Sequence, residues 1–223
     1  MQPDTGINLF VTGTDTDVGK TMASAVLIDY MKELDFFYFK PIQTGTIKDI
    51  HLVNQLLSLH YSEEESNVYS LKAPMSPWQA AMKEKKKVSL TKITNKFAHL
   101  QTKHKNILTE GAGGLMVPLS KKIMVVDLIK KLKSQVILVV RPGLGTINHS
   151  LLSLRLLKAR GIKTVGFIVN RFPAQATEIE QENPIMIEKI SGVKCLGLIM
   201  ESPSQDLLPK FCSTFDPNTL LSS

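Results

Sequence analysis

The sequence predicts an α/β fold, in which a doubly wound, mostly parallel sheet has helices on both faces. Two observations support this prediction. Apolar strand-like runs alternate with helix-like segments along nearly the whole chain. Most of these runs are continuously apolar, which is typical of parallel strands buried on both faces. Because the chain has 223 residues and neither a linker nor an internal repeat, we expect a single domain spanning residues 1–223.

The strands and helices are predicted from apolar runs and from helical spacing. Strands are expected at residues 7–11, 36–42, 107–108, 136–140, 165–169 and 195–199. The first helix places five residues on one face, namely Ala23, Val26, Leu27, Tyr30 and Leu34. Further helices are expected at residues 50–59, 90–100, 126–132, 147–159 and 179–190. In such a fold, ligands gather at the carboxyl ends of the strands.

The first strand leads into the segment GTDTDVGKT, residues 13–21, and an amphipathic segment follows. This strand–loop–helix order is typical of a phosphate-binding loop and makes the predicted fold P-loop NTPase-like. Backbone N–H groups around Gly19 can point at a phosphate, Lys20 adds charge, and the Thr21 hydroxyl is placed to ligate Mg²⁺. One more residue than usual separates Gly13 from Gly19. A solvated helix start is the alternative, but the context favours a nucleoside triphosphate site.

Other polar residues follow later strands. Lys40 ends the second strand in the segment KPIQTG, where a crevice lysine and a solvated edge lysine are equally compatible with the spacing. Asp49 opens a helix and by itself favours an N-terminal cap. Glu110 precedes three glycines and suits a magnesium site, although an exposed glutamate in a turn is the alternative.

Two later segments offer contacts for further groups. The helix start at Gly145–Asn148 has free N–H groups that can hold a carboxylate. Asn170, at the tip of a strand, can hydrogen-bond a nucleotide base. His149 alone does not indicate a catalyst, and the sequence contains no nucleophile constellation and no metal-spaced His/Cys cluster.

Together these segments resemble the dethiobiotin synthetase family. The matching segments are, in the family's order, GTDTDVGKT, KPIQTG, SPWQAA, EGAGGLMVPL, LVVRPGLGTINHSLL and GFIVN. The resemblance implies an ATP-dependent ligase that converts 7,8-diaminononanoate, CO₂ and ATP into dethiobiotin, ADP and phosphate with Mg²⁺. A substrate carbamate would attack the γ-phosphate, and the second amine would close the ring. This chemistry depends on positioning and charge stabilisation and needs no protein nucleophile.

The resemblance also implies residue roles. Lys20 and Lys40 would be catalytic, and Thr21, Asp49 and Glu110 would hold Mg²⁺. The implied nucleotide contacts are Asp17, Val18, Gly19, Lys20, Thr21, Met22, Asp49, Glu110, Gly111, Ala112, Gly113, Asn170 and Arg171. The implied substrate contacts are Thr16, Thr44, Gly145, Thr146, Ile147 and Asn148. The implied assembly is a homodimer in which the 145–148 helix start of one subunit holds the carboxylate of substrate bound mainly by the other.

The chain departs from the family pattern at three places. Trp78 replaces a histidine, Asn183 lies near a position that is often aromatic, and Met200 replaces the proline of a Gly-x-Ile-Pro pattern. Because little chain follows Gly197, we expect a poorly lined base pocket and loose nucleotide choice.

Composition excludes other classes. The net charge of +7 comes largely from lysine runs without interleaved aromatics, so we expect no nucleic-acid partner. No secretion signal or membrane-spanning stretch is visible, and Cys195 and Cys212 form no disulfide framework, so we expect a cytoplasmic protein. Two related functions remain as alternatives: a partition-type ATPase switch, and an amidoligase acting on a corrin precursor.

Overall fold

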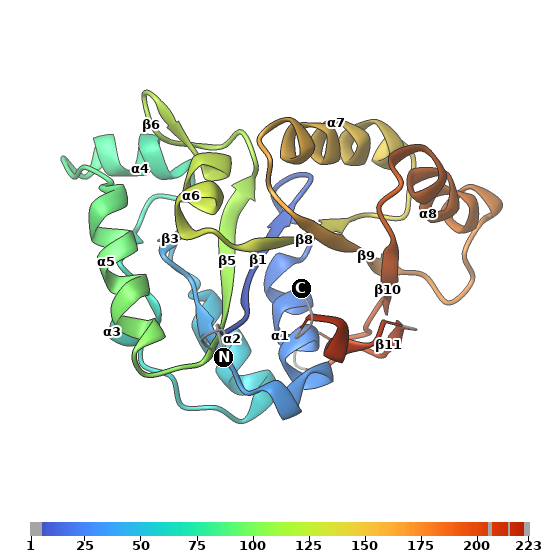
Figure 1. Cartoon of the computed structure of the whole chain (residues 1–223), viewed down its shortest axis with the longest axis horizontal. Coiled ribbons are helices and arrows are strands. Elements are labelled where there is room, and N and C mark those ends of the chain that lie inside the picture. The colour runs from blue at the N-terminus through green and yellow to red at the C-terminus, as the bar shows by residue number, and fades with distance from the viewer. Residues whose placement is uncertain (1–5, 205–206, 214, 221–223) are drawn as a thin grey trace, which may run out of the picture.

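A seven-stranded sheet lies at the centre of the computed structural model (Figure 1), which describes residues 6–204, 207–213 and 215–220. The strand order is β11-β10-β9-β8-β1-β5-β2, and all neighbours are parallel except β10 and β11. These strands are β1 (Asn8–Gly13), β2 (Phe36–Phe39), β5 (Asn106–Gly114), β8 (Gln135–Val140), β9 (Thr164–Phe172), β10 (Cys195–Met200) and β11 (Phe211–Ser213). The predicted doubly wound, mostly parallel sheet is therefore confirmed.

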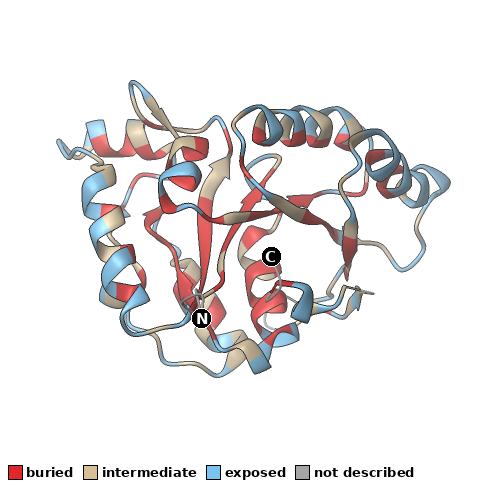
Figure 2. Cartoon of the chain, viewed as in Figure 1, coloured by how far each residue is buried: buried red, intermediate tan, exposed pale blue. Residues whose placement is uncertain are grey.

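Helices cover both faces of the sheet. They are α1 (Lys20–Tyr30), α2 (Asp49–Leu57), α3 (Glu63–Ser66), α4 (Pro77–Lys83), α5 (Leu90–Gln101), α6 (Val125–Leu132), α7 (Thr146–Ala159) and α8 (Glu178–Ser191), with short 3-10 turns at Lys32–Leu34 and Pro217–Leu220. Apolar residues of α1 and α2 pack with one set of strand residues, which includes Leu9 and Leu108. Residues of α5, α6, α7 and α8 pack with the opposite set, which includes Phe10 and Leu138. Figure 2 shows the buried residues along the sheet and on the inward sides of the helices.

Two small sheets lie beside the main one. Strands β3 (Ile42–Thr44) and β4 (Tyr69–Leu71) form a parallel pair, and β6 (Pro118–Ser120) and β7 (Ile123–Met124) form an antiparallel pair. The predicted strand at residues 36–42 is therefore wrong as a single element. Pro41 has no N–H for the ladder, and its carbonyl oxygen accepts from Val68 and Tyr69 instead, so the chain leaves the main sheet after β2.

The predicted strand at residues 107–108 is too short, because β5 continues through the glycines to Gly114. These glycines belong to the strand because the neighbouring strand approaches closely. A Cβ at Gly111 would lie 2.8 Å from Cε1 of Phe10. Glu110 consequently lies within the strand and is 1% exposed, so the alternative of an exposed turn glutamate is wrong.

The first helix also ends earlier than its apolar spacing predicts. Helix α1 stops at Tyr30, and Leu34 belongs to the following 3-10 turn. Tyr30 is 36% exposed, and its ring meets Phe211 edge-on outside the core. The other predicted helices agree with α2, α5, α6, α7 and α8 to within two residues.

Candidate active site

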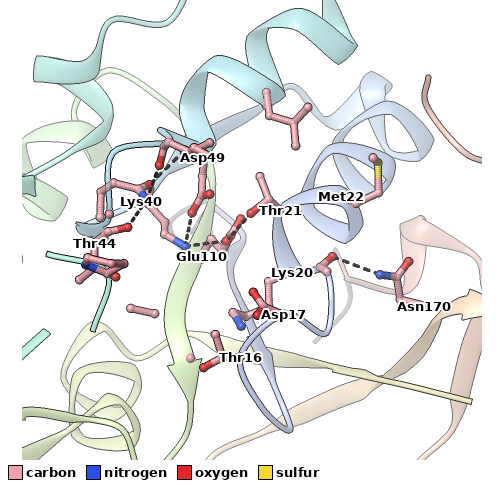
Figure 3. Close-up of a pocket in the computed structure, with 18 of the residues that line it drawn as sticks. Thr16, Asp17, Lys20, Thr21, Met22, Lys40, Thr44, Asp49, Glu110 and Asn170 are labelled. Carbon is pink, nitrogen blue, oxygen red and sulfur yellow. Dashed lines mark hydrogen bonds and ion pairs between the residues drawn. The ribbon is translucent and has the colours of Figure 1, made fainter. Parts of the chain in front are cut away.

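The phosphate-binding loop joins β1 to α1, as predicted from the sequence. Gly19 is the N-cap of α1 and has φ 85°, and Asp17 has φ 56°. A side chain at Gly19 would collide with the Asn170 amide, which donates to the Val18 carbonyl oxygen at 2.8 Å. Asn170, near the carboxyl end of β9, therefore fixes the position of the loop through this hydrogen bond (Figure 3). Its expected contact with a base stays a prediction, and one of its donors is already used inside the protein.

Lys20 begins α1 and is only 8% exposed. Its ammonium donates to the Asp15 carbonyl oxygen at 3.0 Å, within its own loop. Burial and the nearby charge of Lys40 lower the pKa of Lys20 to about 8, although Glu110 and Asp49 act in the opposite direction. Lys20 is thus a buried cation bound to a neutral oxygen, and an anionic phosphate would be a stronger partner.

Lys40 follows β2 directly and has a different environment. Its ammonium lies 2.6 Å from Glu110 Oε1 and 2.7 Å from Asp49 Oδ2, and it also donates to the Gly111 carbonyl oxygen at 3.0 Å. Burial by itself lowers the pKa of Lys40, but the two carboxylates outweigh it and raise the pKa above its ordinary value. The alternative of a solvated edge lysine is wrong, since Lys40 is 4% exposed.

Glu110 connects Lys40 to the phosphate-binding loop. Its Oε1 accepts from Thr21 Oγ1 at 3.0 Å as well as from Lys40. Its Oε2 accepts from Ser24 Oγ at 3.0 Å and from Tyr38 Oη at 2.8 Å. Sequence reasoning missed Ser24 and Tyr38, although both were detectable: Ser24 lies one turn after Lys20 on α1, and Tyr38 shares the strand face of Lys40.

Asp49 is the first residue of α2, and Lys48 is the N-cap. The expectation that Asp49 caps this helix is therefore wrong, because its carboxylate turns to Lys40 instead. Gln43, which sequence reasoning also missed, holds the connecting loop. Its Nε2 donates to the Thr44 and Ile47 carbonyl oxygens, each at 3.0 Å, and its Oε1 accepts from the Asp49 N–H at 3.1 Å.

Lys20, Lys40 and Glu110 line one cavity of about 1040 Å³, together with Thr21, Gln43 and Asp49. The predicted site residues that line it are Thr16, Asp17, Gly19, Lys20, Thr21, Met22, Lys40, Thr44, Asp49, Glu110, Ala112, Gly113, Asn170 and Arg171. Figure 3 shows Lys20, Thr21, Lys40, Asp49 and Glu110 close together; they come from α1, from the end of β2, from α2 and from β5. The carboxyl ends of β1, β2 and β5 thus bring together residues that lie far apart in the sequence.

Two groups of predicted residues lie outside the cavity lining. Val18 and Gly111 contribute backbone oxygens to Asn170 and Lys40, and the helix start at Gly145–Asn148 does not line the cavity. That helix start follows a loop held by Asn183, whose buried amide donates to the Pro142 carbonyl oxygen at 2.7 Å.

The chain after Gly197 contributes more to the cavity than the sequence suggested. Met200, Glu201, Ser202, Ser204 and Pro209 all line it, so the expectation of little material around the base is wrong. Strand β11 explains this, because it turns the chain back against β10. Loose nucleotide choice stays a prediction.

The residues around Lys40 suit a magnesium ion. Thr21, Asp49 and Glu110 offer a hydroxyl and two carboxylates, which are the hard oxygen ligands that Mg²⁺ prefers. No group of three or more His, Cys, Asp or Glu side chains able to hold a metal occurs in the described part of the chain. An ion at this site would therefore take its remaining ligands from phosphate oxygens and water. None of the described helices is both long and apolar enough to cross a membrane.

Comparisons with known proteins agree with this geometry. A family model described as an AAA domain matches residues 7–206. The ATP-dependent dethiobiotin synthetase BioD of Methanococcus vannielii is 39% identical over 194 residues, which cover 86% of this chain and 92% of the relative. BioD of Bacillus subtilis strain 168 is 35% identical over 196 residues, covering 85% of each chain.

Solved structures with a similar fold include two cell-division or partition ATPases. MinD of Pyrococcus horikoshii OT3 in complex with Mg-ADP has a TM-score of 0.57 and 19% identity, covering 87% of this chain and 81% of MinD. A ParA family ATPase from Chlorobium tepidum TLS has a TM-score of 0.55 and 14% identity, covering 89% and 85%. At these identities the likeness shows the fold alone.

The sheet, the phosphate-binding loop and the lysine–carboxylate cluster define a P-loop enzyme that uses ATP. Within this class, the chain belongs to the family of ATP-dependent dethiobiotin synthetases, which are carbon–nitrogen ligases of biotin biosynthesis.

Proposed function

We propose that this protein uses Mg²⁺ and ATP to carboxylate 7,8-diaminononanoate with CO₂ and to close the ureido ring of dethiobiotin. The observation that supports this most strongly is one cavity lined by both buried lysines, Lys20 from the phosphate-binding loop and Lys40 from the end of β2. The site has cations for a phosphate and a carbamate, and no nucleophile–base pair is needed. This composition suits a reaction in which the substrates supply every reacting atom.

The reaction balances without a protein nucleophile. One substrate amine adds to CO₂ and loses a proton, giving a carbamate. A carbamate oxygen then attacks the γ-phosphorus of ATP, and ADP leaves. The second amine attacks the carbonyl carbon of this mixed anhydride, and phosphate leaves as the ring closes.

The lysines have separate roles in this proposal. Lys20 exchanges its bond to the Asp15 carbonyl oxygen for the phosphates of ATP. Lys40, fixed by Glu110 and Asp49, stabilises the negative charge of the carbamate and of the transferring phosphoryl group. Thr21, Asp49 and Glu110 would hold Mg²⁺, which when bound would offset the negative charge of the phosphates.

The substrate lies between Thr44 and Thr16 at its reacting end, and the helix start Gly145–Asn148 of a second subunit holds its carboxylate. The position of that helix start outside the cavity supports a shared site. Leu144, in the loop before α7, and Leu152, within α7, are 91% and 60% exposed. A second subunit that covered this helix start would remove both leucines from water.

A product assay tests the proposal. The purified protein is incubated with diaminononanoate, ¹³C-bicarbonate, ATP and Mg²⁺, and dethiobiotin is measured by mass spectrometry. We expect one ¹³C-labelled dethiobiotin for each ADP and each phosphate released. ATP hydrolysis that does not depend on diaminononanoate would instead favour the ATPase switch, and activity only with a corrin precursor would favour the amidoligase.

A further inference from the structure

Tyr38 is a polar residue in a position where the core is otherwise apolar. It is the third residue of β2, is 0% exposed and packs with the apolar residues beneath α1 and α2. A buried tyrosine needs a partner for its hydroxyl. The register pairs Tyr38 with Leu108 of β5, and because side chains alternate along strands, Tyr38 and Glu110 lie on the same face. The Tyr38 hydroxyl therefore meets the Glu110 carboxylate, at 2.8 Å.

The two oxygens of Glu110 are divided between different tasks. Among the described residues, the donors to Oε2 are Ser24 on α1 and Tyr38 on β2, and neither of them lines the cavity. Oε1 accepts from Thr21 and Lys40, which face the cavity. Burial and the charges of Glu110 and Asp49 raise the pKa of Tyr38, so the phenol keeps the proton that it donates.

We propose that Tyr38 is a positioning residue of the metal and phosphate site: by binding Oε2 from the sheet side, it orients Glu110 so that Oε1 faces Thr21, Lys40 and Mg²⁺. This inference rests on the proposed role of Glu110 toward Mg²⁺. Groups that hydrogen-bond a metal-ligating carboxylate fix its orientation, and their loss typically weakens metal binding about 10-fold to 100-fold.

The variant Tyr38→Phe removes a single hydroxyl and keeps the ring in the core. In this variant Ser24 is the remaining donor to Glu110 Oε2. The carboxylate can then rotate and move Oε1 away from Thr21 and Lys40. We expect the Mg²⁺ concentration for half-maximal activity to rise about 10-fold, while kcat at saturating Mg²⁺ stays within about threefold of the unmodified protein. A role in folding alone would lower kcat through loss of active protein and would leave the Mg²⁺ midpoint unchanged.

Tyr61→Phe is the matched control. The Tyr61 hydroxyl lies 3.4 Å from the Phe36 carbonyl oxygen, and its ring packs against Phe37 of the same strand β2. It therefore also removes one tyrosine hydroxyl next to β2, but without contacting Glu110. We expect its Mg²⁺ midpoint to stay within twofold of the unmodified protein.

The decisive measurement is Mn²⁺ binding, followed by electron paramagnetic resonance, to protein saturated with a non-hydrolysable ATP analogue. It needs no diaminononanoate, so it tests Tyr38 even if the protein makes no dethiobiotin. We expect the Kd for Mn²⁺ to rise about 10-fold to 100-fold in Tyr38→Phe and to stay within twofold in Tyr61→Phe.

Should Tyr38→Phe fail to fold, Ser24→Ala removes the other donor to Oε2 and should also weaken Mn²⁺ binding. An unchanged Kd in folded Tyr38→Phe, an equal loss in Tyr61→Phe, or an unchanged Kd in Ser24→Ala when it has to serve as the replacement overturns the proposal.

Discussion

Lys20 and Lys40 line the same cavity and both are almost fully buried, but their surroundings shift their pKa values in opposite directions. Lys40 lies between two carboxylates at 2.6 and 2.7 Å, and their charges raise its pKa. Lys20 contacts a neutral carbonyl oxygen, and burial lowers its pKa to about 8. Lys40 is therefore paired before any ligand arrives, whereas no carboxylate of the described residues lies within hydrogen-bonding distance of Lys20.

This difference indicates a division of labour. An ammonium group held in place by protein carboxylates, such as that of Lys40, is preorganised. It suits the stabilisation of negative charge that develops on a reacting group in the transition state. A buried ammonium group without an anionic partner, such as that of Lys20, forms a stronger interaction when a phosphate binds. Such a group suits nucleotide binding. We therefore expect changes at Lys40 to affect mainly turnover, and changes in Lys20's protonation to affect mainly nucleotide affinity.

The largest expected effect is that of Lys40→Ala on catalysis. Loss of one preorganised charge should lower dethiobiotin formation about 100-fold to 1000-fold, while ADP binding stays within a few-fold, since Lys20 and the loop remain. The variant also leaves the buried Glu110 carboxylate and the partly buried Asp49 carboxylate without their cation, so we expect unfolding to require about 3–5 kcal/mol less. Turnover, ADP calorimetry and urea unfolding measure these three effects.

Lys103→Ala is the control for Lys40→Ala. Lys103 is a half-exposed lysine that pairs with Glu65 at 3.6 Å, and neither residue lines the cavity. It should change neither turnover nor stability by more than a small amount. If Lys40→Ala retains turnover within a factor of a few, Lys40 has no part in the reaction.

The second effect concerns the two carboxylates that pair with Lys40. Glu110→Gln and Asp49→Asn each remove an anionic oxygen ligand, so each should raise the Mg²⁺ concentration needed for activity by about 10-fold or more. Thr21→Val should act in the same direction through loss of a hydroxyl. Mg²⁺ titrations of turnover measure this, and curves that overlay that of the unmodified protein would show that the metal assignment is wrong.

The sequence predicted the site residues that lie in one contiguous motif better than the site residues that meet through long-range contacts. The loop around Gly19 and Lys20 is contiguous, so its strand–loop–helix order identified it directly. The contact of Lys40 with Glu110 was not predicted, since Glu110 lies 70 residues away and reaches Lys40 through the pairing of β2 with β5. Tyr38 was missed because an aromatic residue in an apolar run chiefly indicates a strand. Its two-residue spacing from Lys40 places both residues on one face, but the hydrogen bond to Glu110 is visible only in the fold.

Prediction of the strands was limited in the same way, because a pattern within one segment was recognised and packing between segments was not. The continuous apolar runs that became β1, β8, β9 and β10 were recognised, because burial on both faces leaves an unbroken hydrophobic pattern. The glycines of β5 were not included in the predicted strand, since their composition alone does not reveal the Phe10 ring packed against Gly111. The short strands β3 and β6 were also missed, because three residues give too little periodicity to detect.

A smaller effect tests whether the second subunit completes the site. Asn148→Ala should raise the KM for diaminononanoate about 10-fold and leave the KM for ATP nearly unchanged, because the helix start lies outside the cavity that holds both lysines. Mixing Asn148→Ala with Lys40→Ala subunits should restore part of the lost activity, since each mixed dimer would contain one intact site. A fully active monomer would contradict the shared site.

The smallest expected effect is on nucleotide affinity at alkaline pH. A Lys20 pKa of about 8 means that the free protein loses this charge as pH rises through 8, whereas phosphate keeps the bound form protonated. Between pH 7.5 and 8.5 the affinity for ATP should therefore fall about threefold, with proton uptake on binding. Calorimetry in buffers of different ionisation enthalpy measures both, and proton release on binding would contradict the assignment.

The most direct test of the contrast between the two lysines is a ¹⁵N NMR titration of the lysine Nζ atoms in nucleotide-free protein, assigned with Lys20→Arg and Lys40→Arg. The account predicts that Lys20 titrates near pH 8 and that Lys40 remains charged beyond the ordinary lysine pKa of 10.5. It also predicts that a bound nucleotide moves the Lys20 titration upward and leaves Lys40 charged. If Lys20 stays charged to pH 10, or if Lys40 is the lysine that titrates near pH 8, the proposed division between them is wrong.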